Sequence, residues 1–452
     1  MSQVLLLGGD LAAYAAAIEL AEVGVKVWLA DAKMSVPLDP VRDPGGEIAG
    51  FLHEIAAPLT AGGPATSGVT PRAVTQPRVV LRARDGAWKP VPEPSVWGIP
   101  AVPLSKESIA MLGTGGAFRA YLDRVKPVLT IGKENNLGRL VDSRLGKATR
   151  LTLVEPLVFE RFGVCAGDAE VARVEPGLNA ALTRAGSLSG GVLQQLEEHV
   201  ARETAIEPEV GWQGLEDLLL ERLRLYGAEP FPATVVMCEP AEHGWTVTDE
   251  AGQQYHCDGI VGGLDEISRV VGESSSPDSA MLGQESSPGI VDRLVSLRPA
   301  AVREYVDISI EGGQDSFPDL AGTAALFLVE SEHTDTWAAR FTRGASGASV
   351  LRLSGPAGPH GAKGAAPIAE ALAAAGVTAT PTTPPTVRRS PVAHATAAER
   401  DAQASERAAW TEAFPTMILA GAALHGDALG EALAEARNEA VRLRRKLTGI
   451  SK

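Results

Sequence analysis

The sequence is poor in the residues that build covalent or metal-centred sites. It has only three cysteines, Cys165, Cys238 and Cys257, and none are in CxxC spacing, which argues against a disulfide framework or a thiolate metal site and favours a reducing compartment. Its eight histidines are scattered singly, without HxH, HExxH or i,i+4 pairs, and no G-x-S-x-G element presents a nucleophilic serine. The sequence therefore predicts no metal site and leaves catalytic residues unassigned.

Positive charge and long apolar runs are also scarce. The chain has 41 Lys and Arg against 56 Asp and Glu, a net charge of −15, which repels phosphate backbones and anionic headgroups and argues against nucleic acid. A small apolar ligand or a protein partner is expected instead. No run of about 18 apolar residues and no signal-peptide pattern is found, so a cytoplasmic location is expected. Contact of an apolar patch with a membrane surface and the oligomeric state are left open.

The composition is that of a folded, multidomain protein. The chain has 452 residues, of which 45% are hydrophobic and 21% charged. At roughly 150 residues per domain, this length predicts two or three domains or one large composite fold.

The N-terminal residues follow a β-α-β pattern. The apolar run VLLL at residues 4–7 predicts a buried strand, and Gly8 and Gly9 come directly after it. Residues 11–24 predict a helix ending at Gly24, and residues 25–30 predict a second strand ending before Asp31. Such a unit usually opens a Rossmann-like dinucleotide-binding domain.

The glycine loop of this unit departs from the G-x-G-x-x-G pattern, in which the first glycine makes the turn, the second admits a pyrophosphate and the third lets helix and strand pack. Here the three positions are Gly8, Asp10 and Ala13. A carboxylate beside a pyrophosphate repels it by several kcal/mol at an effective dielectric of about 20. Outward rotation of Asp10, or use of Gly9 for the close approach, would relieve the conflict. Asp31 is the acid expected to bind a ribose hydroxyl. The alternative is a β-α-β unit that binds nothing.

Several short elements resemble, in family order, the protoporphyrinogen oxidase family of the FAD-dependent amine-oxidase superfamily. They are Glu155-Pro156-Leu157, Cys165-Ala166-Gly167-Asp168, Gly186-Ser187-Leu188, residues 211–230, Gly244-Trp245, Asp258-Gly259-Ile260-Val261 and residues 417–440. No single element is diagnostic, but their order extends over nearly the whole chain.

The resemblance implies an α/β fold of α+β composite type: a Rossmann-like FAD-type domain with an inserted helical lobe and a mixed-sheet substrate domain. The expected parts are residues 1–105, the first part of the FAD-type domain; 106–226, the helical substrate lobe; 227–271, the middle part of the FAD-type domain; 272–289, a mobile loop; 290–414, the strands and loops of the substrate domain; and 415–452, the last part of the FAD-type domain. The first, middle and last parts are expected to meet in one layered domain.

The resemblance also implies FAD as cofactor and a set of residues to hold it: Gly8, Gly9, Ala13, Asp31, Arg42, Gly45, Gly46, Val235, Gly421 and Leu429. The positions where this sequence departs from the family pattern lie in or beside this set of residues. Asp10 replaces a glycine, the R-x-G-G element is found only as the longer Arg42-Asp43-Pro44-Gly45-Gly46, Ala422 replaces a polar residue, and Asp427 adds a second carboxylate. Weak flavin affinity is therefore expected.

Two functions are compatible with this pattern. The first is an FAD-dependent oxidoreductase that acts on a large apolar substrate such as a porphyrinogen, with the flavin carrying the chemistry. The second is a catalytically silent relative that has lost FAD and serves as a binding or scaffold protein. A third, weaker possibility is a binder of another nucleotide through the β-α-β unit.

Overall fold

The computed structural model describes the chain in two compact units. The residues that it does not describe are 1, 31–32, 38, 44, 61–62, 64, 75–76, 128–133, 200–204, 272–289, 298–299, 311–322, 333–334, 344–348, 378–382 and 450–452. The expected loop at 272–289 and the expected ribose ligand Asp31 lie outside the described residues. Unit 1 comprises Met1–Thr75, Arg202–Ala300 and Asp401–Lys452, and unit 2 comprises Gln76–Ala201 and Ala301–Arg400.

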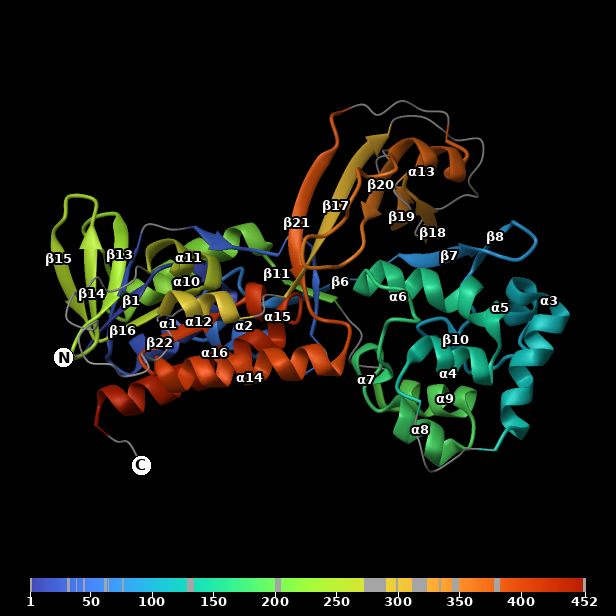
Figure 1. Ribbon diagram of the computed structural model, residues 1–452, viewed down its shortest axis with the longest axis horizontal. Helices are drawn as coiled ribbons and strands as arrows, with labels where there is room; N and C mark the ends of the chain where they lie inside the picture. Colours follow the sequence, from blue (N-terminus) through green and yellow to red (C-terminus); the bar gives the residue numbers. More distant parts are fainter. Residues whose placement is uncertain are drawn as a thin grey trace, which may run out of the picture. The chain divides into compact units, whose positions relative to one another are not determined.

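A five-stranded parallel sheet forms the centre of unit 1 (Figure 1). Its order is β12 (Glu229–Pro230), β3 (Lys26–Leu29), β1 (Gln3–Leu6), β16 (Gly259–Gly263) and β22 (Met417–Ala420). Strands from the start, the middle and the end of the chain therefore lie side by side. The three parts that were expected to meet in one layered domain each contribute at least one strand to this sheet.

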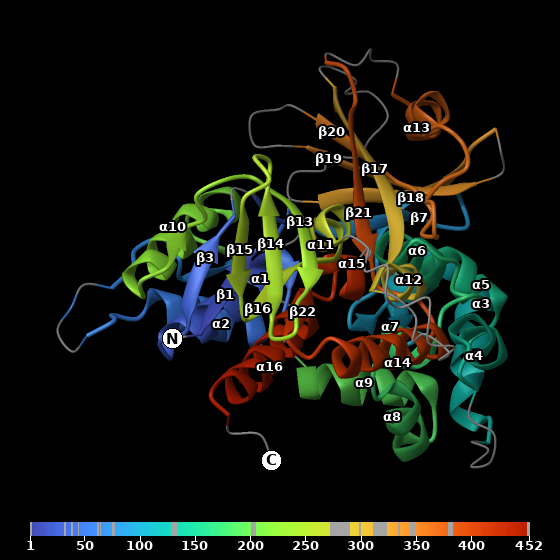
Figure 2. The same cartoon turned by 60° about the vertical axis from the view of Figure 1, so that its left-hand side comes forward.

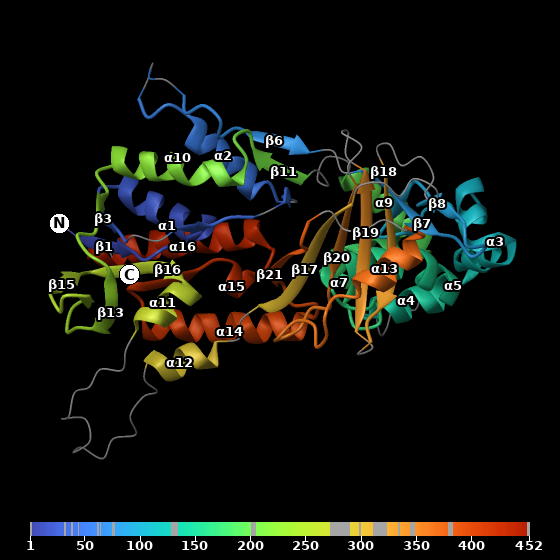
Figure 3. The same cartoon turned by 90° about the horizontal axis from the view of Figure 1, so that it is seen from above.

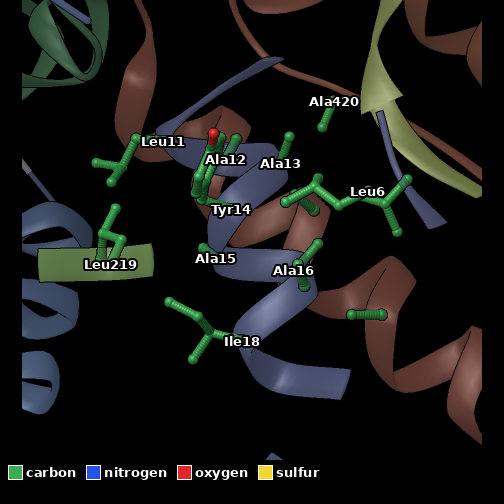
Figure 4. Packing of buried hydrophobic residues seen from close by; sticks show 14 of the residues in the cluster. Leu6, Leu11, Ala12, Ala13, Tyr14, Ala15, Ala16, Ile18, Leu219 and Ala420 are labelled. Atoms are coloured by element: carbon green, nitrogen blue, oxygen red, sulfur yellow. The ribbon is translucent and has the colours of Figure 1, made fainter. Parts of the chain in front are cut away.

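One face of this sheet is covered by helices α1 (Leu11–Glu22), α2 (Glu47–Ala56), α10 (Trp212–Leu225) and α16 (Leu429–Leu447) (Figure 3). Helix α1 is alanine-rich and buried almost all round, because small side chains let neighbouring backbones approach closely and alanine has the highest helix propensity. Figure 4 shows Ala12, Ala13, Tyr14 and Ile18 in this core.

The other face carries a second core, to which Leu5 and Leu7 contribute because side chains alternate along β1. It is covered by the small antiparallel sheet of β13 (Val235–Pro240), β14 (Trp245–Asp249) and β15 (Gln254–Cys257), which Figure 2 shows in front of β1 and β16. Helices α11 (Leu264–Val270), α12 (Ile290–Ser296), α15 (Ala422–His425) and the part of α14 (Ala397–Ala413) that belongs to unit 1 complete this layer. The sheet is therefore covered on both faces, as a parallel sheet requires.

Two small sheets complete unit 1. β2 (Gly9–Asp10) pairs with β4 (Met34–Ser35), and β11 (Ala205–Pro208) pairs with β5 (Val41–Arg42) and β6 (Pro71–Val74).

A seven-stranded sheet forms one half of unit 2. Its order is β21 (Thr386–Val392), β17 (Ala301–Ile310), β20 (Ser349–Ser354), β19 (Thr336–Arg343), β18 (Thr323–Glu330), β7 (Arg78–Arg82) and β8 (Trp88–Pro90). Helix α13 (Ile368–Ala375) packs on one face around Trp337, and α6 (Glu155–Phe162) packs on the other through Phe159.

The other half of unit 2 is a helical lobe with its own apolar core. Besides α6, it contains the hairpin of β9 (Ser95–Val96) and β10 (Ile99–Pro100), α3 (Lys106–Tyr121), a 3₁₀ turn (Leu122–Val125), α4 (Leu137–Arg144), α5 (Lys147–Thr149), a π-helical turn (Arg150–Val154), α7 (Val171–Val174), α8 (Leu178–Ala185) and α9 (Leu188–His199).

The units differ from the expected domain parts at both ends of the helical lobe. Residues 78–100, expected in the first part of the FAD-type domain, belong to unit 2 because β7 pairs in parallel with β18. Helix α10, expected in the lobe, belongs to unit 1, where Leu215, Leu219 and Leu223 join the core under α1. Residues 290–300 and 401–414 also belong to unit 1 rather than to the substrate domain.

Candidate cofactor site

The glycine loop after β1 is shaped by close contact between two strand ends. Gly8 and Gly9 have φ angles of 111° and 132°, which favour glycine. A Cβ on Gly9 would lie 2.9 Å from both Ala13 Cβ and Gly263 N, and Gly263 N donates to Gly8 O at 3.1 Å. These two glycines therefore let the ends of β1 and β16 touch each other.

Asp10 is the N-cap of α1, and its carboxylate joins two helix beginnings. Ala12 N donates to Asp10 Oδ1 at 3.0 Å, and Ala422 N, at the first position of α15, donates to Asp10 Oδ2 at 2.6 Å. The side chain is buried, with the residue 7% exposed. One buried carboxylate thus accepts from its own helix and from an amide that lies 412 residues further along the chain.

Opposing effects act on the pKa of Asp10. Burial raises it above the ordinary value of 3.8, while the amides of Ala422, Ala12 and Ala13 and the charge of His425 lower it, and the net direction is upward. A buried carboxyl is tolerated when its oxygens accept hydrogen bonds. Asp10 is therefore built into the fold and does not point to solvent.

Gly421 is brought directly against this carboxylate. Its φ is 98°, and a Cβ there would lie 2.5 Å from Asp10 Oδ2. Gly421 belongs to the element at residues 417–440 that the resemblance singles out. This element therefore meets the glycine loop, as expected for a cofactor site, but the space between them holds the side chain of Asp10.

The segment after β3 closes the same loop from another side. Gly9 and Asp10 pair in parallel with Met34 and Ser35. Met34 N donates to Glu216 Oε1 at 2.6 Å, and Tyr14 Oη donates to the same oxygen at 3.4 Å. Burial, together with Glu216, raises the pKa of Tyr14 above its ordinary range. A glutamate from α10 thus holds the segment that follows the second strand.

A second carboxylate, that of the half-buried Asp43, caps α2. Asp43 Oδ1 accepts from Ile48 N at 3.2 Å and Oδ2 from Ala49 N at 2.8 Å, while Gly46 begins the helix with a φ of 80°. A Cβ on Gly430 would lie 3.2 Å from Glu47 Oε2 and 3.5 Å from Asp43 Oδ1. The R-x-G-G-like element and the start of α16 therefore lie together, with carboxylates between them.

The predicted site residues that the structure describes, all but Asp31, form two groups and one outlier. Gly8, Gly9, Ala13 and Gly421 surround Asp10, whereas Gly45, Gly46 and Leu429 lie at the adjoining beginnings of α2 and α16, next to Arg42 on β5. Val235 begins β13 and packs in the core on the other face of the main sheet.

A chain of hydrogen-bonded side chains beside Asp10 was not predicted from the sequence. His425, at the end of α15, places Nε2 3.1 Å from Glu435 Oε2, and Arg407 Nε lies 3.1 Å from Glu435 Oε1. The side chain of His425 is 8% exposed. His425 and Glu435 are ten residues apart in the chain, a spacing that does not predict a contact. They meet because α15 ends at Gly426 and α16 begins only at Leu429.

The His425–Glu435–Arg407 chain predicts a pH dependence. Burial would raise the pKa of Glu435, but the hydrogen bond and charge of His425, together with Arg407, lower it below 4.5. A carboxylate with a lowered pKa stabilises the fold above its ordinary pKa, and this contribution is lost as the pH falls through the lowered value. Glu435→Gln is therefore expected to lower the melting temperature at pH 7 and to have a shrinking effect below pH 4.5. Melting curves of both proteins across this range test it, and a constant difference would contradict it.

The residues present do not fit the anionic half of FAD in this arrangement. A pyrophosphate binds at a helix N-terminus through backbone amides, but the amides of Ala12 and Ala422 already donate to Asp10. A phosphate beside this carboxylate would also meet like charge in a poorly solvated place. Among the residues that the structure describes, no group of three or more His, Cys, Asp or Glu could hold a metal ion, and none of the helices is long and apolar enough to cross a membrane.

Comparisons with known proteins show what this chain is similar to. No family model matches it. Coproporphyrinogen III oxidase of Mycobacterium leprae (strain TN) is 30% identical over 196 residues, which are 42% of this chain and 41% of that protein. The chain therefore spans about two fifths of the length of this curated relative.

Solved structures match over almost the whole chain. A protein from Exiguobacterium sp. 255-15, provisionally assigned as a protoporphyrinogen oxidase, has a TM-score of 0.71 at 16% identity, over 98% of this chain and 99% of that one. Reduced UDP-galactopyranose mutase has a TM-score of 0.58 at 12% identity, over 100% and 94%. A triple mutant of putrescine oxidase has a TM-score of 0.50 at 10% identity, over 100% and 99%.

These likenesses define the class of fold. It is the α/β composite fold of FAD-dependent oxidoreductases, as the sequence predicted. More particularly, the predicted resemblance to protoporphyrinogen oxidase-like proteins is confirmed at the level of the fold.

Proposed function

We propose that this protein is a flavin-free relative of the protoporphyrinogen oxidase-like proteins, which keeps their fold as a binding or scaffold protein. The observation that carries this proposal is the buried carboxylate of Asp10, bonded to the amides of Ala12 and Ala422. The expected ligand is a large apolar molecule such as a tetrapyrrole, or a protein partner, and the expected location is the cytoplasm.

The electrostatics of the loop support this proposal. Hydrogen bonds to a charged group contribute about 1.5–3 kcal/mol each, so an incoming phosphate would have to displace Asp10 from two such bonds. Asp43 occupies the beginning of α2 in the same manner. The fold therefore supplies from its own side chains the negative charge that these helix beginnings favour.

The second candidate function is an FAD-dependent oxidoreductase acting on a large apolar substrate such as a porphyrinogen. It is favoured by the match of 98% of the chain to the Exiguobacterium protein and by the 30% identity to a coproporphyrinogen III oxidase. This function requires Asp10 to leave both amides and turn away when the cofactor binds.

A flavin titration separates the two functions. The purified chain is expected to lack the visible absorbance of flavin and to leave the fluorescence of added FAD unquenched. Asp10→Gly removes the like charge and frees the amides, so it is expected to strengthen FAD binding by about tenfold for each 1.4 kcal/mol gained. Asp265→Ala, which removes an exposed carboxylate from the first turn of α11, serves as the matched control. Flavin that copurifies with the unmodified chain and survives gel filtration would support the oxidoreductase instead.

A further inference from the structure

Helix α15 is a single turn with a glycine at each end. Gly421 and Gly426 have φ angles of 98° and 63°, which glycine adopts at little cost. Within the turn, Leu424 is buried, and Ala300 N donates to Ala423 O at 2.6 Å. Because glycine leaves the backbone free to rotate on both sides, the position of α15 depends on this packing and on the side-chain bonds at its two ends.

Side chains from two other elements hold the ends of α15. At its start, Ala422 N donates to Asp10 Oδ2 at 2.6 Å. At its end, His425 Nε2 lies 3.1 Å from Glu435 Oε2, and the side chain of His425 is buried. Burial acts to raise the pKa of both carboxyls and the charge of His425 acts to lower both, with a net rise for Asp10 and a net fall for Glu435. One imidazole thus interacts with the carboxyl groups at both ends of the turn.

The elements packed around α15 carry further charged groups. These are Glu266 and Arg269 of α11, Arg407 of α14, Asp427 between α15 and α16, and Glu439 and Arg442 of α16. Each of the three arginines pairs with an acid, since Arg269 contacts Glu266, Arg407 contacts Glu435 and Arg442 contacts Glu439. Arginine keeps its charge between pH 5 and 8, whereas histidine changes charge in this range. His425 is therefore the cation of this cluster that titrates.

We propose that α15 is a pH-sensitive connection between the N-terminal glycine loop and helix α16, which proton uptake by His425 strengthens. Protonation places a positive charge beside the carboxylates of Asp10 and Glu435, and a hydrogen bond between charged partners is roughly twice as strong as a neutral one. When the proton leaves, the buried carboxylate of Asp10 loses a charge that offsets the cost of its burial. A histidine with a carboxylate partner contributes stability at low pH and loses it as the pH rises. α15 is therefore held more firmly at about pH 6 than at about pH 8.

The connection regulates the candidate site, because α15 borders the glycine loop through the bond from Ala422 N to Asp10. Loosening of α15 exposes the carboxylate of Asp10 and separates the two segments that this carboxylate joins. The inference goes beyond the proposed function, since it concerns how α15 is held and not which ligand the protein binds.

Hydrogen exchange of the full chain tests this inference. Mass spectrometry follows the peptide of residues 417–428 at about pH 5.5, 6.5 and 8, and each rate is divided by the intrinsic rate at the same pH. Protection of this peptide is expected to fall at least about threefold from the lowest to the highest pH, within the limit of about tenfold per pH unit for one linked proton. His425→Gln keeps a polar side chain that does not titrate, so its protection is expected to be constant. His256→Gln, the matched control, changes an exposed histidine 3.9 Å from Asp258 and is expected to behave like the unmodified chain.

Three results would overturn the proposal. One is equal protection of the peptide at all three pH values in the unmodified chain. Another is a pH dependence that His425→Gln retains, because a different group would then be the one that titrates. The third is a change in exchange shared by all peptides of unit 1, which would report global unfolding instead of movement of α15. No flavin is added, so these results are separate from those of the flavin titration.

A second variant keeps the test decisive if circular dichroism shows that His425→Gln has lost its fold. Glu435→Gln removes one of the two carboxylates beside His425. It is expected to show a smaller pH dependence of exchange in residues 417–428 than the unmodified chain. An undiminished pH dependence in this variant would contradict the role of the His425–Glu435 pair.

Discussion

Asp10→Ala is expected to lower the melting temperature of the protein by about 5–10 °C. The substitution removes the N-cap of α1 and the bond to Ala422 N at the start of α15. Loss of an N-cap costs about 0.5–2 kcal/mol, and leaving a buried amide without an acceptor costs about 1–3 kcal/mol. In a unit of this size each kcal/mol corresponds to roughly 2–4 °C.

The Asp10→Ala variant also tests whether the Asp10 carboxylate occupies a position that could bind an anion, or only caps α1. Because the substitution frees two amides, added pyrophosphate is expected to raise the melting temperature of Asp10→Ala but not that of the unmodified chain. Asp10→Asn keeps one acceptor oxygen and is expected to lose less stability than Asp10→Ala. Equal stabilisation of all three proteins by pyrophosphate would show that the anion binds elsewhere.

Arg303→Met is expected to destabilise unit 2 by about 3–4 kcal/mol. Arg303 is fully buried on β17. Its guanidinium donates to four carbonyls: Phe159 O at 2.8 Å and Ser354 O at 3.4 Å, together with Glu160 O and Gly355 O. Burial lowers the pKa of Arg303. Its planar guanidinium donates at the same time to carbonyls in the last turn of α6 and at the end of β20. Methionine has an apolar side chain and removes all the Arg303 donors; of the four carbonyls, Phe159 O still accepts from Gly163 N at 2.8 Å.

Denaturant unfolding measures this effect. Arg303→Lys keeps the positive charge but loses the planar set of guanidinium donors, so an intermediate loss in the free energy of unfolding is expected. Arg389→Ala, on neighbouring β21, is the control, because Arg389 is exposed and pairs with Glu304 at the surface, where ion pairs contribute little. A loss from Arg303→Met no larger than that of the control would contradict the stabilising role of the carbonyl cluster.

The sequence predicted best those parts of the fold that are set by local pattern. The run at residues 4–7, the glycines after it and the alanine-rich helix ending near Gly24 are found as β1, the loop and α1. Strand β7 and helix α10 were placed in the wrong parts, because their partners are distant. β7 pairs with β18, about 245 residues further along the chain, by the register Arg78↔Thr323, and local periodicity does not specify such a partner.

The sequence named residues of the candidate site, but it did not show which of them contact one another. Asp10 was singled out as a departure from the glycine pattern, and its charge was expected to repel a cofactor; the structure places its carboxylate against Ala12 N and Ala422 N. The bond to Ala422 N could not be foreseen, since it depends on β22 lying two strands away from β1 in the folded sheet. His425 and Glu435 were missed for the same kind of reason, because a break between two helices brings them together.

The order of strands in unit 1 has a consequence for synthesis on the ribosome. β1 and β3 emerge first, but β16 joins them only after residue 263 and β22 only after residue 420. Until then the edge of β16, whose five residues are all buried in the finished sheet, has no neighbour, and the face of α1 that α16 covers is bare. An open apolar edge is a template for pairing with other chains, so this edge stays exposed to such pairing until β22 and α16 have been translated.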